Sequence, residues 1–274
     1  MCGIFGFASD GIQRGEVQSI LDRALSAMRH RGPDSNGSWT ADSGRMTFGH
    51  VRLAIQDLTA AGHQPMPSTS GRYCITFNGE VYNHRDIRAR LERAGWSGSW
   101  RGSSDTETIV NAVEAFGVSE TLKAMVGMFA LAIWDHEDQV LYLARDRIGE
   151  KPLYFGEVGG RFAFSSELKP LMQMPGFERE VDEVSLAEFF RYNYVPHPRT
   201  IFKKVSKLGP GEFLKYSISS GQTAVERYWV PADAMAEHGS SQFDESRWLA
   251  CPAGACGTRG RPLDPVVENG GDVV

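Results

Sequence analysis

Hydrophobic positions recur with a helical period in several stretches of the chain. Over 17–28, apolar side chains return every three or four residues, which is the spacing of one face of an amphipathic helix. Capping boxes formed by Ser104 with Glu107, and by Ser185 with Glu188, predict where two further helices begin. Helices are predicted over 17–28, 83–95, 104–117 and 185–192.

Short apolar runs predict strands between these helices. The run MFALAIWD at 128–135 is hydrophobic at nearly every position, whereas a strand with one wet face would alternate. A few polar residues separate it from 139–146, so the two are expected to pair as a hairpin. Both faces of such strands need cover, which predicts sheets enclosed between layers of helix. Further strands are predicted over 2–8, 46–58, 72–79, 151–156, 160–167, 211–216 and 226–230, with a loop over 30–37.

The pattern ends towards the C-terminus. Residues 250–274 hold five Gly and three Pro, no aromatic residue and no hydrophobic period, a composition that cannot offset the entropy of ordering the chain. We therefore expect one domain over 2–230, followed by a linker and a disordered or aberrant tail over 231–274. Cys251 and Cys256 lie in this tail without a second pair of ligands, which argues against a zinc site.

Composition and charge exclude several classes of function. The 274 residues are 41% hydrophobic, enough for a substantial core, and carry a net charge of −5 with scattered Lys and Arg, so nucleic acid is not an expected partner. No segment reaches the ~18 apolar residues that span a bilayer, and the N-terminus lacks the basic region of a signal peptide. A cytoplasmic location without a membrane partner is expected, and four cysteines are too few for a disulfide framework.

Cys2 is the first candidate for chemistry. Removal of Met1 would make Cys2 the N-terminal residue, so that the sulfur and a free α-amino group belong to one residue. That amine has an ordinary pKa of about 7.7–8.0, so its unprotonated fraction can take the proton of the thiol and create a nucleophile. The alternative is an inert cysteine buried in the first strand.

An oxyanion site is the second candidate. In FNGEVYN at 77–83, the side-chain amide of Asn78 and the backbone N–H of Gly79 can both donate to one developing negative charge. Because glycine has no side chain, a substrate can approach the backbone closely there. Asn-Gly is also the signal of a tight hairpin turn, which is the alternative.

Three charged residues are candidates for holding an amino acid by its α-groups. Arg52 lies in an apolar stretch, where it either extends to solvent or clamps a carboxylate. Asp105 begins a predicted helix, where it either compensates the helix dipole or binds an ammonium group, and Glu80 is a candidate to share that task. Together with Cys2, these residues suit a free α-amino acid with a cleavable side-chain carbonyl, of which glutamine is an example.

Eight motifs give the chain a resemblance to a known family. MCGIFGF, RHRGPDSNG, HVRLAIQDL, FNGEVYNH, SSDTE, ARDRIGEKPLYF, SSELKPL and KLGPGE occur in the order found in glutamine-hydrolysing asparagine synthetases. The resemblance covers about residues 1–230. The start MCGI is shared by class II glutamine amidotransferases in general, whereas RDRIGEKPLYF and NGEVYNH resemble the asparagine synthetase branch rather than the phosphoribosylamine or hexosamine-phosphate synthases.

The resemblance implies the glutaminase domain of such an enzyme. Its fold would be the α+β N-terminal-nucleophile hydrolase, an αββα sandwich of four layers. Glutamine would pass through a glutamyl thioester to glutamate and ammonia, without cofactor or metal. The implied site residues are Cys2 as nucleophile with its α-amine as base and acid, Asn78 and Gly79 as oxyanion donors, Arg52 for the α-carboxylate, and Asp105 with Glu80 for the α-ammonium group.

The second domain of this family binds ATP and adenylates aspartate, and it has no counterpart here. Neither its SGGxDS loop nor a GxxxxGK motif occurs in the sequence. ATP and Mg²⁺ are therefore expected only with a separately supplied synthetase domain, and the expected partners are L-glutamine and either a synthetase partner or a second copy in a homodimer. An inert truncated fragment, acting as an interaction or regulatory module, is the alternative. An amidase for another amide is disfavoured by Arg52 and Asp105.

Overall fold

The computed structural model describes residues 1–55 and 57–232. The chain divides into two units, Met1–Val230 and Pro231–Val274, and the named helices and strands all lie in the first. The predicted tail, with Cys251 and Cys256, falls outside the described residues apart from its first two positions.

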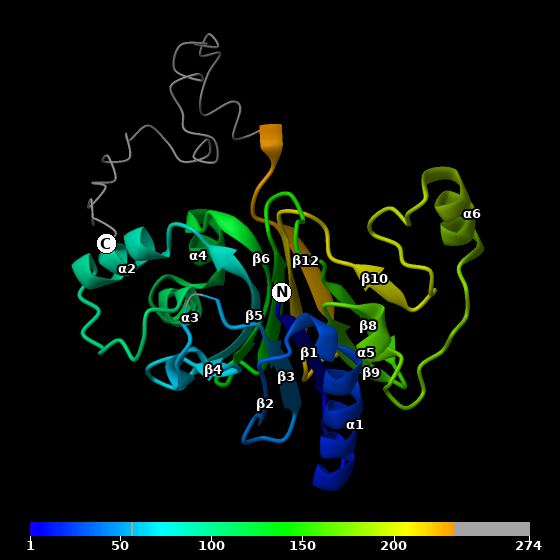
Figure 1. Ribbon diagram of the computed structural model, residues 1–274, viewed down its shortest axis with the longest axis horizontal. Coiled ribbons are helices and arrows are strands. Elements are labelled where there is room, and N and C mark those ends of the chain that lie inside the picture. Colours follow the sequence, from blue (N-terminus) through cyan, green and yellow to red (C-terminus); the bar gives the residue numbers. More distant parts are fainter. Residues whose placement is uncertain (56, 233–274) are drawn as a thin grey trace, which may run out of the picture. The chain divides into compact units, whose positions relative to one another are not determined.

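Two antiparallel six-stranded sheets form the centre of the first unit (Figure 1). The strand order is β10-β8-β9-β1-β3-β2 in the first sheet and β12-β11-β7-β6-β5-β4 in the second. The first sheet contains β1 (Gly3–Ala8), β2 (Ser35–Thr40), β3 (Met46–Arg52), β8 (Tyr154–Val158), β9 (Arg161–Ser165) and β10 (Val205–Lys207). The second contains β4 (Met66–Pro67), β5 (Tyr73–Val81), β6 (Gly127–Asp135), β7 (Val140–Arg145), β11 (Glu212–Ser217) and β12 (Thr223–Arg227).

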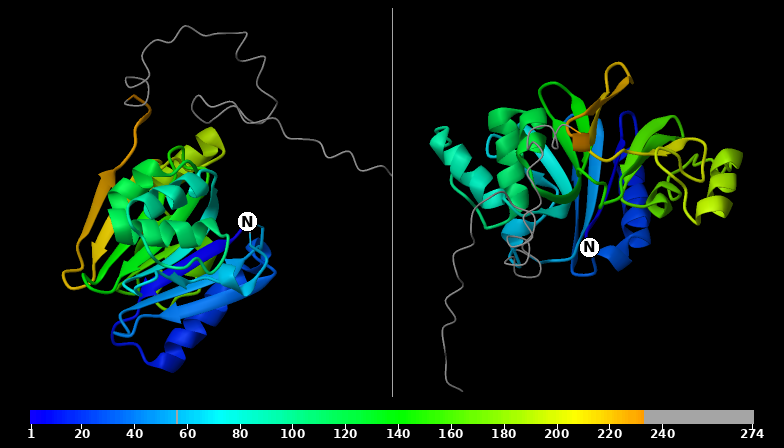
Figure 2. Two further views of the ribbon diagram at one scale, coloured as in Figure 1. Left: turned by 90° about the vertical axis from the view of Figure 1, so that its left-hand side faces the viewer. Right: turned by 90° about the horizontal axis from the view of Figure 1, so that it is seen from above.

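Helices cover the outer face of each sheet, so the unit has four layers. Two helices pack on the first sheet. Three lie over the second, where the longest of them contacts the strands and the other two pack against it. Figures 1 and 2 show this arrangement. The first pair is α1 (Arg14–Ala27) and α5 (Leu168–Leu171), and the other three are α2 (His84–Arg93), α3 (Asp105–Phe116) and α4 (Val118–Ala124). The predicted αββα sandwich is therefore confirmed.

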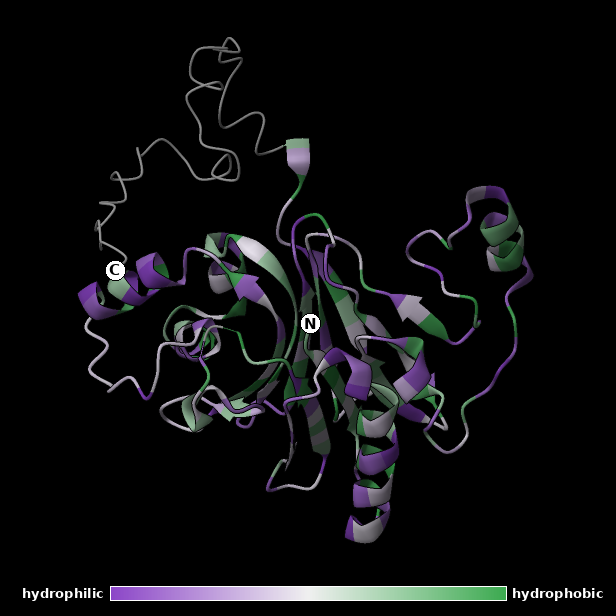
Figure 3. Cartoon of the chain, viewed as in Figure 1, coloured by the Kyte–Doolittle hydropathy of each residue, from purple (hydrophilic) through white to green (hydrophobic). Residues whose placement is uncertain are grey.

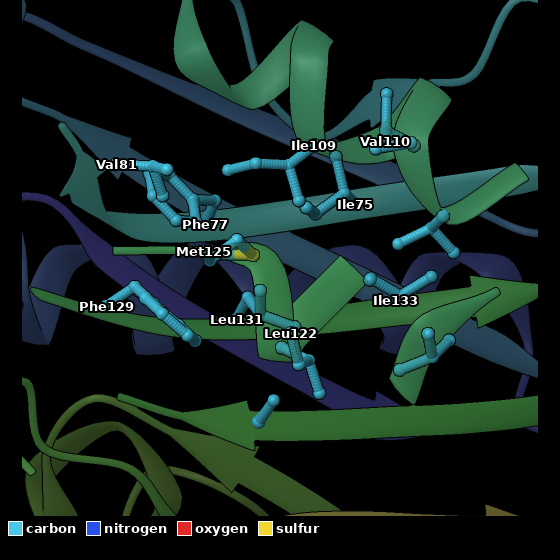
Figure 4. Packing of buried hydrophobic residues seen from close by; sticks show 14 of the residues in the cluster. Ile75, Phe77, Val81, Ile109, Val110, Leu122, Met125, Phe129, Leu131 and Ile133 are labelled. Atoms are coloured by element: carbon cyan, nitrogen blue, oxygen red, sulfur yellow. The ribbon is translucent and has the colours of Figure 1, made fainter. Parts of the chain in front are cut away.

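Side chains along the central strands point alternately to the two faces of the sheet, and both faces are buried. On β6, Leu131 and Ile133 pack towards α3 and α4 (Figure 4), whereas Ala132 and Trp134 pack between the two sheets. Each large apolar side chain buried in this way contributes about 1.5–3 kcal/mol to folding. Figure 3 shows hydrophobic residues along the strands and hydrophilic stretches on α1 and α2. The run of apolar residues at 128–135 was therefore correctly interpreted as a strand covered on both sides.

Two predicted boundaries on the first sheet are wrong. The loop expected over 30–37 contains a short 3-10 helix, Arg29–Arg31, and the beginning of β2. Its polar residues suit a strand because β2 is an edge strand with mostly exposed side chains. The strand expected over 46–58 ends at Arg52, because the chain then turns back to contact the Arg52 guanidinium.

The two predicted capping boxes have different outcomes. Ser104 caps α3 as expected, since its Oγ accepts the Glu107 N–H over 3.3 Å, although the Glu107 carboxylate binds other backbone N–H groups. The cap at Ser185 is wrong. The last helix, α6 (Glu183–Tyr192), begins earlier, and its cap is Asp182, whose carboxylate accepts the N–H of Ser185 over 3.1 Å. Within the described ranges, no helix is long and apolar enough to cross a bilayer.

Candidate active site

Five of the six predicted site residues line one pocket, which we call the Cys2 pocket. They come from the residue before β1, the end of β3, the C-terminal end of β5 and the start of α3. Asn78 is buried and is not among the residues that line this pocket. The five lining residues are Cys2, Arg52, Gly79, Glu80 and Asp105.

Cys2 is half-buried at the start of β1. The Leu53 N–H donates to its Sγ over 3.4 Å, and the Sγ–H donates to the Leu53 carbonyl over 3.5 Å. Burial raises the pKa of the Cys2 thiol, against the Leu53 hydrogen bond and the positive charges of the N-terminus and Arg52. Near neutral pH the sulfur therefore keeps its proton, and it needs a base to become a nucleophile. In the structure Met1 precedes Cys2, so the Cys2 nitrogen is part of a peptide bond.

Asn78 and Gly79 lie within β5 and not in a turn. They stand opposite Ala130 and Phe129 of β6, so the hairpin-turn alternative is wrong. The Asn78 Nδ2 group is buried and has no hydrogen-bond partner among the described residues. Such an unpaired donor costs about 1–3 kcal/mol, and a ligand that accepts from it would recover this energy.

The backbone N–H of Gly79 points away from β6. Alternate N–H groups of a strand point to the same edge. On either side of Gly79, Phe77 donates its N–H to Gln64 Oε1 over 2.6 Å and Val81 donates to Asp105 Oδ2 over 2.9 Å. Both acceptors lie outside the β5–β6 ladder, so the N–H of Gly79 faces the same side, where the Cys2 pocket lies.

The Arg52 side chain folds over the loop that follows it. Its Nη1 donates to the Thr59 carbonyl over 3.0 Å and its Nη2 donates to the Asp57 carbonyl, so the solvent-extended alternative is wrong. A guanidinium group has five N–H donors, which leaves donors beyond these two contacts for a carboxylate in the pocket.

Asp105 is a buried carboxylate at the first position of α3. Burial, and to a lesser degree the charge of Glu80, raises its pKa to about 6, against hydrogen bonds from Val81 and Thr106. Its Oδ1 accepts the Thr106 N–H over 2.7 Å, which is the contact expected of a helix-start carboxylate. The raised pKa means that its negative charge is under-compensated, so a cation bound beside it would be stabilised.

Three further residues line the pocket that the sequence did not single out, namely Gln64, Asp57 and Thr106. Asp57 and Thr106 lie within the motifs HVRLAIQDL and SSDTE but had no assigned role, and Gln64 lies outside all eight motifs. Arg31 is buried and its Nε donates to the Cys2 carbonyl over 2.9 Å, while its Nη1 pairs with Glu167 over 3.0 Å. These contacts join distant parts of the chain, so local spacing does not record them.

Comparison with known proteins places the chain in a family. Residues 1–229 match the family model of a glutamine amidotransferase domain. A putative glutamine-hydrolysing asparagine synthetase of Mycobacterium bovis is 34% identical over 264 residues, covering 89% of this chain and 40% of the relative. Glutamine-hydrolysing asparagine synthetase 3 of Bacillus subtilis is 32% identical over 249 residues, covering 90% and 39%. The chain thus spans about two fifths of the length of these relatives.

Solved structures share the fold at lower identity. Glutamine phosphoribosylpyrophosphate amidotransferase of Bacillus subtilis matches with a TM-score of 0.61 and 20% identity, over 84% of this chain and 50% of that one. A structure described as the allosteric regulatory enzyme of purine biosynthesis matches with a TM-score of 0.62, 20% identity, and 84% and 49% coverage. On the family match and this shared N-terminal-nucleophile fold, the chain belongs to the class II glutamine amidotransferases, as a domain similar to that of the asparagine synthetases.

Proposed function

We propose that this domain hydrolyses L-glutamine to L-glutamate and ammonia through a thioester on Cys2. The observation that supports it is the meeting, in one pocket, of a thiol, a backbone donor at Gly79, and the opposite charges of Arg52 and Asp105. A carboxylate held by Arg52 and an ammonium group held by Asp105 and Glu80 would orient a free α-amino acid. The side-chain amide of that amino acid would then extend towards Cys2.

Acylation needs the amine that removal of Met1 would free. That amine takes the Sγ proton while Sγ forms a bond to the amide carbon of glutamine, and the carbonyl electron pair moves onto oxygen. Because burial raises the thiol pKa, proton transfer must accompany the attack. The N–H of Gly79 is one donor for the oxyanion. The unpaired Nδ2 group of Asn78, which does not line the pocket in this structure, would have to turn towards it to act as the other. The ammonium group then returns its proton to the leaving nitrogen, the C–N bond breaks and ammonia departs.

In deacylation, water is the nucleophile and the Cys2 sulfur is the leaving group. The free amine takes a proton from water as the oxygen adds to the thioester carbon, and the same donors stabilise the second oxyanion. The C–S bond then breaks, the sulfur regains a proton from the ammonium group, and glutamate leaves. Each step uses only groups of this chain, the substrate and water.

Glutamate release from glutamine tests the proposal, with the N-terminus of the purified chain read by mass spectrometry. We expect release from chains that begin at Cys2 and none from chains that keep Met1, because a peptide nitrogen cannot act as the base. Cys2→Ala should abolish release. Cys74→Ala is the matched control, since Cys74 is the other free thiol of the described residues and is buried between the sheets. A processed, folded wild type without hydrolysis would contradict the proposal.

We further propose that the ammonia serves a synthetase partner that amidates aspartate or a similar carboxylate. The longer asparagine synthetase relatives support this proposal. ATP and Mg²⁺ would act in the partner. The given sequence contains neither an SGGxDS loop nor a GxxxxGK motif, and within residues 1–55 and 57–232 no group of three or more His, Cys, Asp or Glu side chains could hold a metal. Glutamine-dependent asparagine formation with a separately added synthetase domain, aspartate, ATP and Mg²⁺ is the test. A cytoplasmic location, a homodimer and the absence of nucleic-acid partners stay predictions.

An interaction module is the second candidate, because α6 exposes aromatic side chains. Phe190 is 77% exposed and Tyr192 46% exposed, and α6 lies apart from the sheets in Figures 1 and 2. Exposed apolar patches of this kind mark surfaces that bind other proteins. Glutaminase activity of the processed chain alone would favour the enzyme, and activity or complex formation only with a partner would favour the module.

A further inference from the structure

We propose that Gln64 and His50 are positioning residues that hold the free edge of β5 and thereby aim the oxyanion donors. The inference rests on the proposed function, because it concerns the donors at Asn78 and Gly79. Neither residue has a place in the reaction steps above. Both would act on catalysis through the backbone of β5.

The strand that carries the donors is paired along only part of its length. On the side away from β6, β4 pairs with β5 only at Ile75 and Cys74. From Phe77 to Val81 this edge has no strand partner among the described residues. An unpaired edge leaves backbone N–H and C=O groups to be satisfied by other means, and the N–H of Gly79 is one of them.

Side chains replace the missing strand at Phe77. The N–H of Phe77 donates to Gln64 Oε1 over 2.6 Å, and its carbonyl lies 3.2 Å from His50 Nε2. A carbonyl can only accept, so the His50 imidazole must carry its proton on Nε2. Both backbone groups of the residue before Asn78 are therefore held by buried side chains.

Gln64 also ties this edge to α3. Its Nε2 donates to Thr106 Oγ1 over 3.2 Å, and Asp105, the neighbour of Thr106, accepts the N–H of Val81. The edge is thus held two residues before Gly79 by Gln64 and two residues after it by Asp105. The N–H of Gly79 lies between two tethered positions, so its direction is set before substrate binds.

His50 connects the strand of the donors to the strand of the nucleophile. His50 lies on β3 opposite Ile4 of β1, and Ile4 is two residues after Cys2. The hydrogen bond of His50 to Phe77 crosses from the first sheet to the second. Burial lowers the pKa of His50 to about 3, so the neutral ring keeps this bond wherever the enzyme is folded and active. The distance between sulfur and oxyanion donors would depend on this bridge.

The variants Gln64→Met and His50→Met remove the two bridges while retaining bulk. His50→Gln is the conservative variant, because its amide can still donate to the Phe77 carbonyl. Asn111→Leu is the matched control. Asn111 is a buried amide that accepts the Thr69 N–H over 2.9 Å and so bridges the loop after Gln64 to α3 in a similar way. It lies outside the Cys2 pocket.

We expect both Met variants to lower kcat for glutamine hydrolysis by about 100-fold, the effect of misplacing a reacting group by about 1 Å, with KM nearly unchanged. Alkylation of Cys2 by iodoacetamide should keep its rate, since that reaction forms no oxyanion. His50→Gln should recover activity, and Asn111→Leu should keep wild-type kcat. Unchanged kcat in both Met variants, or an equal loss in Asn111→Leu, would overturn the proposal.

Amide hydrogen exchange measured by NMR provides a readout that needs no activity. Gln64→Met should accelerate exchange at Phe77 and Gly79 but not at Leu131 of β6, whereas Asn111→Leu should accelerate it at Thr69. Unchanged exchange at Phe77 in Gln64→Met would overturn the proposal whatever the activity. If the wild type fails to hydrolyse glutamine while exchange responds as expected, the proposed function fails and the tethering of the β5 edge is supported.

Discussion

Asp105 is the residue whose charge state decides how the pocket treats an amino acid. Its pKa of about 6 is raised first by burial and then by the charge of Glu80. Above this pKa it is an anion that can pair with an α-ammonium group, and below it the neutral acid cannot. The affinity for glutamine should therefore depend on pH within a range where glutamine itself does not change charge.

We predict that KM for glutamine rises as the pH falls through about 6 in the wild type. Asp105→Asn should raise KM at neutral pH and abolish this dependence, because it removes the titrating carboxylate. Glu80→Gln removes a cause that raises the pKa, so it should move the midpoint to lower pH. Steady-state kinetics across this pH range make the measurement. A profile in Asp105→Asn that parallels the wild type would assign the dependence to another group.

The beginning of α6 shows how an element is defined by its first turn. Ser185 carries the sequence signal of a cap. In the structure, however, its hydroxyl and its N–H both donate to the Asp182 carboxylate. Asp182 therefore satisfies one of the unpaired N–H groups of the first helical turn. Ser and Asp are both good caps, so composition alone does not choose between them. The observed cap is three residues earlier than the expected one.

We predict that Asp182→Ala lowers the free energy of unfolding, because the helix loses its N-cap. Asp182→Ser should retain most of the stability because its hydroxyl can accept the same N–H. Neither change should alter glutamine hydrolysis, since α6 does not line the Cys2 pocket. Chemical denaturation of the variants measures the difference. Equal losses from the alanine and serine variants would show that the cap is not the cause.

The Met1–Val230 unit contains every described site residue and all three apolar clusters. Tyr228, near its end, is buried against the second sheet, and its hydroxyl donates to the Arg145 carbonyl over 2.8 Å. Trp229 packs against the same cluster. The limit of the folded unit should therefore lie just after these two aromatic residues.

We predict that a chain ending at Val230 keeps the melting temperature and the glutaminase rate of the full chain. A chain ending at Glu226 loses Tyr228 and Trp229, and its free energy of unfolding should fall by about 3 kcal/mol or more, as for truncation of large buried aromatics. Thermal unfolding followed by circular dichroism compares the two. If the chain ending at Val230 had a much lower melting temperature than the full chain, residues beyond 230 would contribute to the fold.

Much of the architecture and part of the site follow from local pattern. The period of apolar positions predicted α1, α2 and α3 and the β6–β7 hairpin, because periodicity reports which faces of an element are buried. Residue chemistry and family motifs selected Cys2, Arg52, Glu80 and Asp105, which the structure brings into one pocket with Gly79. Their individual roles stay predictions.

The sequence by itself determined the buried faces of most elements and the inventory of reactive groups, since both depend on neighbours along the chain. The predicted strand over 72–79 contains Asn78 and Gly79, but the Asn-Gly pair also signals a turn, and only the pairing of both residues with β6 decided between the two. Tertiary structure also decided that Gln64 and His50 hold that strand, through contacts across 13 and 27 residues of chain. The first of these contacts depends on how the chain before β4 returns to the edge of β5, and the second on how the two sheets meet. No local spacing encodes either arrangement.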